Sequence, residues 1–123
     1  MYCFRTIDEP SGLTYTTTER PGGVRVVTIV GDVDAATVET FDEALATGER
    51  LVVDLTRVAF LGCAGVRSLL AANNRARLAV VLGGHAVTRS LEATGADVLL
   101  EIHPRVGAAL ADLTPVAEPG REA

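Results

Sequence analysis

Short runs of apolar and β-branched residues recur along the chain and predict strands. The runs "LTYTTT" (13–18) and "VRVVTIV" (24–30) flank the turn signal "PGG", so together they predict a β-hairpin. Two further runs, "LVVDL" (51–55) and "LAVVL" (78–82), are almost wholly apolar, which is typical of central strands covered on both faces. The stretch "DVLLEI" (97–102) predicts a short last strand.

Between the expected strands, apolar residues recur at helical spacing. Asp34 is placed to cap the first helix, because its carboxylate can accept hydrogen bonds from the amides of a first turn. That helix has Val38, Phe41 and Leu45 on one face, and Gly48 is its natural stop.

Three more helices follow the same pattern. The second should begin near residue 64, the third spans "AVTRSLEAT" (86–94) and stops at Gly95, and the last opens at His103-Pro104. The order β-β-α-β-α-β-α-β-α predicts one α/β sandwich, with a mixed sheet of four or five strands and about four helices. We expect this domain to span residues 13–113, after an N-terminal extension (1–12) and before a disordered polar tail (114–123).

Charge and cysteine content narrow the class of protein. The net charge is −5 and all eleven basic residues are scattered arginines, which argues against direct binding of nucleic acid or an anionic membrane. Cys3 and Cys63 lie far apart, as in proteins of a reducing compartment. The chain has neither a signal-peptide pattern nor an apolar run long enough for membrane insertion, so a cytoplasmic protein is expected.

The usual signatures of catalysis and of cofactor binding are missing. The chain contains no GxxxxGK[ST], no GxGxxG opening a helix and no GxSxG, so neither an enzyme nor a cofactor is expected. Gly83-Gly84 fits a tight turn better than an anion site. His85 and His103 have no Cys, Asp or Glu at ligand spacing beside them, so no metal site is expected.

Two features leave alternatives open. Asp32 and Asp34 fit a turn residue and a helix cap better than an acid–base pair or a cation site, although they could belong to a binding surface. Cys63, at the start of a helix, could be a redox-sensitive thiol, but a small hydrophobic role is favoured, because no base or second thiol is near it in sequence.

Three stretches of the chain resemble the STAS domain family. They are "VVTIVGDVDAATVETFDEAL", "LVVDLTRVAFLGCAGVRSLL" and "LAVVLGGHAVTRSLEATGADVLLEIHPRVGAAL", and the resemblance runs from about Leu13 to Leu113. The branch that looks most similar is the bacterial anti-sigma factor antagonists. The resemblance implies a domain that binds an anti-sigma factor of the ATP-binding serine-kinase type and so regulates sigma-factor-dependent transcription.

The resemblance also locates a regulatory site that this chain has altered. The family's kinase phosphorylates the second hydroxyl residue of an Asp-Ser-Ser-Gly motif, at the start of the second helix. Here the motif reads Gly62-Cys63-Ala64-Gly65, and Ala64 has no oxygen to phosphorylate. We therefore expect a binding-competent module that is not switched at this position. Thr56 and Ser68 remain as alternative acceptors, although structural roles are favoured for both.

The expected partner-binding surface surrounds this altered motif. It centres on residues 62–66, with Arg67 on the exposed side of the helix and Asp32 and Asp34 at the edge; its core residues are Gly62, Cys63, Ala64, Gly65 and Val66. An adaptor role in a lipid-transport or stress-sensing complex is the alternative function. Whether the chain forms a homodimer stays open.

Overall fold

A computed structural model describes residues 12–113 of the chain. The expected tail (114–123) lies outside the described residues, as does the expected extension (1–12) except Gly12. The elements, in chain order, are β1 (Thr14–Arg20), β2 (Val24–Val33), α1 (Val38–Leu45), β3 (Arg50–Leu61), α2 (Cys63–Arg75), β4 (Arg77–Val81), α3 (His85–Thr94), α4 (Ala96–Leu99), β5 (Glu101–His103) and α5 (Val106–Leu113).

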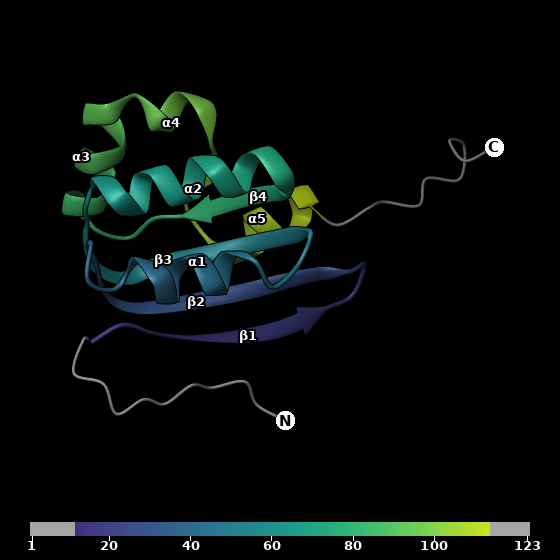
Figure 1. The fold of residues 1–123 in the computed structure, drawn as a ribbon. Helices are drawn as coiled ribbons and strands as arrows, with labels where there is room; N and C mark the ends of the chain where they lie inside the picture. The colour runs from purple at the N-terminus through teal and green to yellow at the C-terminus, as the bar shows by residue number, and fades with distance from the viewer. Residues whose placement is uncertain (1–11, 114–123) are drawn as a thin grey trace.

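The five strands form one mixed sheet in the order β1-β2-β3-β4-β5 (Figure 1). β1 and β2 are antiparallel and make the expected hairpin, with Thr14 opposite Val30 and Arg20 opposite Val24. The remaining neighbours are parallel. Parallel neighbours need crossover connections, and helices supply them. The α/β class and the mixed sheet are therefore confirmed.

Helices cover the two faces of the sheet unequally. α1, α2 and α3 pack on one face, where Phe41, Leu69 and Leu91 belong to the larger buried cluster. α5 lies on the opposite face, where Ala109 and Leu113 join a smaller cluster. Figure 1 shows α1 and α2 in front of the sheet and α5 behind it. The molecule therefore has a helix–sheet–helix layering with most of its core on the α1–α3 side.

Two predicted boundaries in the last third of the chain are wrong. Gly95 ends α3 in the left-handed conformation, as expected. The chain then forms an additional short helix, α4, in which Ala96 is buried while Val98 and Leu99 face outward. The last strand is consequently only three residues long, and His103 belongs to it rather than to α5.

β3 is much longer than the predicted run of five residues. It spans twelve residues and pairs with β2 through two shifts of register, one between Thr28 and Val30 and one between Gly31 and Asp32. Gly31 has φ +123°, and a Cβ there would lie 1.8 Å from the carbonyl oxygen of Gly12, so only glycine fits this close approach.

Candidate functional site

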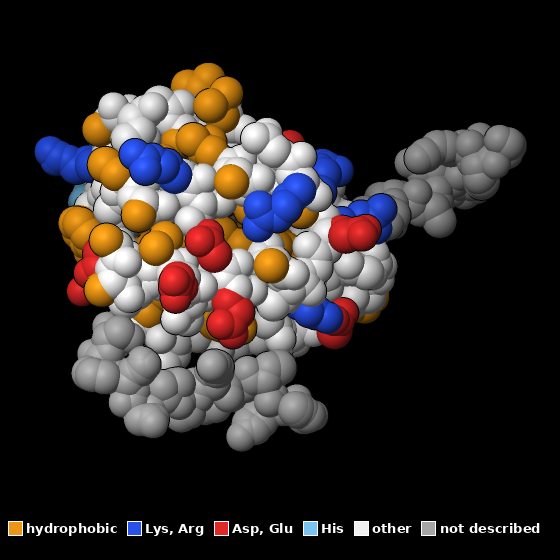
Figure 2. Space-filling model, in the orientation of Figure 1, with side chains coloured by type: hydrophobic (Ala, Val, Ile, Leu, Met, Phe, Trp, Pro, Cys, Tyr) orange, Lys and Arg blue, Asp and Glu red, His pale blue; other side chains and the backbone are white. Residues whose placement is uncertain are grey.

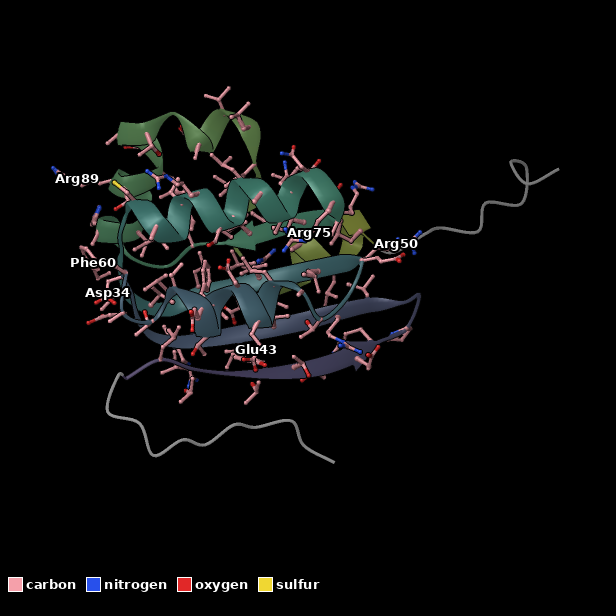
Figure 3. The ribbon with its side chains drawn as sticks, viewed as in Figure 1. Asp34, Glu43, Arg50, Phe60, Arg75 and Arg89 are labelled. Atoms are coloured by element: carbon pink, nitrogen blue, oxygen red, sulfur yellow. The ribbon has the colours of Figure 1, made fainter. Side chains whose placement is uncertain are left out.

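The predicted site residues meet at the carboxyl ends of β2 and β3. There Asp32 pairs with Phe60 and Val33 with Leu61, and the Gly62 amide donates a hydrogen bond to the Val33 carbonyl at 2.8 Å. α1 and α2 both begin at this end of the sheet, and Figure 3 shows Asp34 and Phe60 close together there. The carboxyl ends of parallel strands are a common place for binding sites in open α/β sheets.

Polar side chains fix the junction between β2 and α1. α1 begins at Val38, with Thr37 as its N-cap residue, so the prediction that Asp34 caps the helix is wrong. Asp34 acts one turn earlier, where its Oδ1 accepts hydrogen bonds from the Ala36 amide at 2.9 Å and the Thr37 amide at 3.2 Å. The buried Thr37 hydroxyl donates to the Asp32 carbonyl at 2.9 Å and accepts from the Asp34 amide at 3.0 Å.

The junction between β3 and α2 has no such polar support. Gly62 is the N-cap residue of α2, and no side chain in the described part of the molecule caps this helix. The amides of Cys63, Ala64 and Gly65 have no acceptor within the helix, because the first turn always leaves its N–H groups unpaired. Cys63 is exposed and Ala64 half-buried, so the predicted start of a helix at the altered motif is confirmed to within one residue.

Gly65 and Val66 lie beneath this surface rather than on it. A Cβ on Gly65 would lie 2.5 Å from Leu61 Cδ1 and 2.6 Å from Val33 Cγ1, so glycine lets α2 rest directly on the ends of β2 and β3. Val66 is buried in the larger core cluster. A partner would therefore meet Cys63, Ala64 and the exposed Arg67, whereas Gly65 supports them from below and Val66 only lines the neighbouring groove.

Phe60 is the prominent surface residue that the sequence did not single out. Its side chain is 48% exposed, and a Cβ on Gly62 would lie 3.2 Å from Phe60 Cε2. The ring therefore occupies space that a side chain at position 62 would need. The register shift beside Asp32 inserts an extra residue in β3 and changes which side chains point outward, and an alternating pattern cannot reveal such a shift.

Phe60 borders an open groove between the start of α2 and the second half of α3. The groove has a volume of about 290 Å³, and its lining residues are Phe60, Leu61, Gly62, Cys63, Val66, Ser90, Ala93 and Thr94. Figure 2 shows hydrophobic side chains gathered at this end of the molecule, with acidic side chains beside them over α1. None of the lining residues is a carboxylate or an imidazole. This composition suits the docking of an apolar side chain from a partner.

The alternative acceptor residues have distinct environments. Ser68 is only 8% exposed within α2, so a kinase could not reach its hydroxyl in the folded domain. Thr56 is exposed on β3, and its hydroxyl donates to Asp54 Oδ1 at 2.7 Å.

A Cβ on Gly83 would lie 2.9 Å from Thr56 Cα, so glycine at position 83 allows two backbone segments to approach closely.

Comparison with known proteins identifies the fold and the family. The family model of the STAS domain matches residues 15–109. The chain belongs to the STAS domain family. An anti-sigma factor antagonist from Mycobacterium paratuberculosis is 28% identical to this STAS domain with a TM-score of 0.77, over 87% of this chain and 98% of that one. A search of curated proteins finds no match.

Two more distant structures share the STAS fold. A candidate anti-sigma factor antagonist from Thermotoga maritima is 14% identical, with a TM-score of 0.70 over 80% of this chain and 93% of that one. The unphosphorylated antagonist SpoIIAA is 14% identical, with a TM-score of 0.58 over 80% and 94% of the two chains. No helix within residues 12–113 is both long and apolar enough to cross a membrane.

Proposed function

We propose that this STAS domain is an anti-sigma factor antagonist. It binds an anti-sigma factor of the serine-kinase type and so regulates sigma-factor-dependent transcription from the cytoplasm. The observation that carries the proposal is the exposed Phe60 beside an apolar groove at the start of α2. The 28% identical anti-sigma factor antagonist from Mycobacterium paratuberculosis supports an anti-sigma factor as the partner.

The start of α2 favours binding without control by phosphate. A phosphate group adds about −1.5 to −2 charges and three acceptor oxygens, and it would block a partner packed against the same turn. Ala64 presents only a methyl group there, so it keeps the shape of an unphosphorylated site and cannot be phosphorylated. Control of this protein would then act through its synthesis, its partner or another position.

The acidic side chains near the groove indicate which kind of partner surface would be complementary to it. Asp32, the strand partner of Phe60, is exposed at this end of the sheet, and α1, which begins at the same end, adds the exposed Glu39 in its first turn, so that the two carboxylates form an acidic rim. A basic patch on the partner would match this rim and would raise the association rate more than the final affinity. The centre of the contact should be apolar, with the Phe60 ring and the groove excluding water around it.

The test is a calorimetric titration of the full chain with purified serine-kinase-type anti-sigma factors from the same organism. Phe60→Ala should weaken binding about 30-fold or more, because central aromatic residues contribute about 2 kcal/mol or more to interfaces. Val98→Ala is the matched control, since Val98 is 81% exposed on α4, away from the groove. Its affinity should stay within about twofold of the native value.

Two results would count against the proposal. The first is an affinity that Phe60→Ala leaves unchanged, which would move the contact away from the groove. The second is no binding to any serine-kinase-type anti-sigma factor, together with capture of lipid-transport or stress-complex subunits by the full chain. That outcome would support the adaptor function.

A further inference from the structure

A second polar cluster lies at the β5 edge of the sheet, on the face that α5 covers. It contains Glu101 and His103 from β5 and Asp112 from α5, and one ligand atom of each lies within 4.8 Å of the others. His103 Nε2 is 3.6 Å from Asp112 Oδ2. α2 and the groove belong to the opposite face, so this cluster is separate from the partner site.

The fold brings these three side chains together through packing that is independent of the cluster. Glu101 and His103 are two residues apart on a strand, so both side chains point to the same face of the sheet. Ala109 and Leu113 of α5 are buried against the neighbouring strands, and this contact holds Asp112 over β5. The hydrophobic core thus positions the backbone segments that carry the three ligand side chains.

The donor set and spacing fit a divalent transition metal. Zn²⁺ binds imidazole nitrogen and carboxylate oxygen at about 2.0–2.2 Å, which separates tetrahedral ligands by about 3.3–3.6 Å. The distance from His103 Nε2 to Asp112 Oδ2 falls at the upper end of that range. Glu101 is exposed, so rotation of its side chain would close the remaining distance. One imidazole with two carboxylates is also unsuited to Mg²⁺, which prefers an all-oxygen shell.

We propose that Glu101, His103 and Asp112 bind a divalent transition metal ion of the Zn²⁺ class, which ties α5 to the edge strand. Such a site has three protein ligands and leaves one position of a tetrahedron for water. Its function is distinct from partner binding at α2. The bound ion would stabilise the folded state by binding it in preference to the unfolded chain.

The positive charge of Arg77, beside the cluster, should affect how tightly the metal ion binds. The Arg77 guanidinium lies 3.6 Å from Asp112 and 3.9 Å from Glu101, too far for a hydrogen bond to either carboxylate. The charges of Arg77, Glu101 and Asp112 sum to −1, so one carboxylate charge has no counterpart among these three side chains. A cation supplies that counterpart, whereas Arg77 repels it. Removing the Arg77 charge should therefore tighten metal binding.

The test is calorimetric titration of the full chain with ZnCl₂, in a Cys3→Ser, Cys63→Ser background that removes thiol ligands. One ion should bind per chain, and MgCl₂ at the same concentration should show no binding. His103→Gln and Asp112→Asn should each abolish saturable binding. His85→Gln is the matched control, because His85 is exposed at the start of α3, outside the cluster, and the affinity should not change.

Two more measurements separate a metal site from a network of ion pairs. Arg77→Gln should raise the zinc affinity several-fold, and zinc should raise the thermal midpoint and shift the ¹⁵N resonance of the His103 imidazole. Absence of saturable binding at millimolar zinc would overturn the proposal. Binding that survives His103→Gln would also overturn it. So would a zinc affinity that falls in Arg77→Gln, because removing a positive charge beside the proposed site should strengthen the binding of a cation.

Discussion

The β2–α1 and β3–α2 junctions lie side by side at one end of the sheet but are held by different physical means. In the first, the Thr37 hydroxyl and the Asp34 carboxylate bond to backbone groups of the turn. In the second, Gly62 and Gly65 allow close packing against Phe60, Leu61 and Val33, with no side-chain cap among the described residues. Side-chain hydrogen bonds fix the first junction, whereas close packing, together with one backbone hydrogen bond from Gly62 to Val33, fixes the second, which we call the shape-dependent junction.

The difference bears on which junction can serve as a contact surface. The Thr37 hydroxyl is buried and already donates and accepts within the turn at α1, so it has little capacity left for a partner. At α2 the unpaired amides and small side chains leave both polar groups and space available. A partner's backbone can therefore approach the start of α2 closely, while α1 contributes charge at the rim.

The largest loss of stability should come from adding a side-chain atom at the shape-dependent junction between β3 and α2. Gly65→Ala places a Cβ within 2.6 Å of Leu61 and Val33 side-chain atoms, and both residues are buried with little room to move. We expect the free energy of unfolding to fall by about 1–3 kcal/mol, despite the higher helix propensity of alanine. Urea denaturation followed by circular dichroism measures this loss.

Gly107→Ala is the matched control for that prediction. Gly107 is also helical, but a Cβ there meets nothing within 4 Å. Its replacement should raise the free energy of unfolding by up to about 1 kcal/mol, through helix propensity alone. If Gly65→Ala behaved in the same way, α2 would not rest on the strands as tightly as the geometry indicates.

A smaller loss is expected at the hydrogen-bonded junction. Thr37→Val keeps the shape of a side chain that is 3% exposed, but it removes the hydroxyl that joins the Asp32 carbonyl to the Asp34 amide. The free energy of unfolding should fall by about 1–2 kcal/mol, because two partly buried backbone groups lose a partner.

Thr88→Val provides the comparison, since the Thr88 hydroxyl bonds only to an exposed carbonyl of its own helix, that of Gly84. Its effect should stay within about 0.5 kcal/mol in the same denaturation assay. Equal losses from the two substitutions would show that the Thr37 bonds add nothing specific to the β2–α1 junction.

The sequence predicted those features that depend on local pattern. The hairpin, the order of the strands and of the four longer helices, and the helix start near Ala64 follow from apolar periodicity and turn residues. α4 was missed because four residues are too few for a periodic signal. The start of α1 was placed at Asp34 rather than Thr37 because either residue type can occupy an N-cap position.

Features that depend on pairing between distant segments could not be predicted in this way. The outward turn of Phe60 follows from a register shift against β2. Likewise, the expectation that His103 has no carboxylate beside it overlooked Glu101, two residues earlier on β5, and the packing of α5 brings Asp112 to the same place. The position of the candidate site was therefore predictable, but its most exposed aromatic residue and the second cluster were not.

The smallest effect on stability, and the sharpest test of the shape-dependent junction, should come from Ala64→Ser. A half-buried methyl group in the first turn becomes a hydroxyl, and the free energy of unfolding should change by no more than about 0.5 kcal/mol. Incubation with the partner kinase and ATP should add one phosphate to this variant, seen by intact mass, and the phosphorylated form should lose affinity through its added charge.

The native chain and Cys63→Ser should both remain unmodified, because neither offers a hydroxyl at the family's acceptor position. Phosphate on the native chain would contradict phosphate-independent binding. If Ala64→Ser binds the kinase but takes no phosphate, the second departure from the motif becomes decisive. Gly62 stands where the family has Asp, and the Phe60 ring occupies the space beside it. Kinase recognition would then have been lost with that carboxylate, even though the surface still binds.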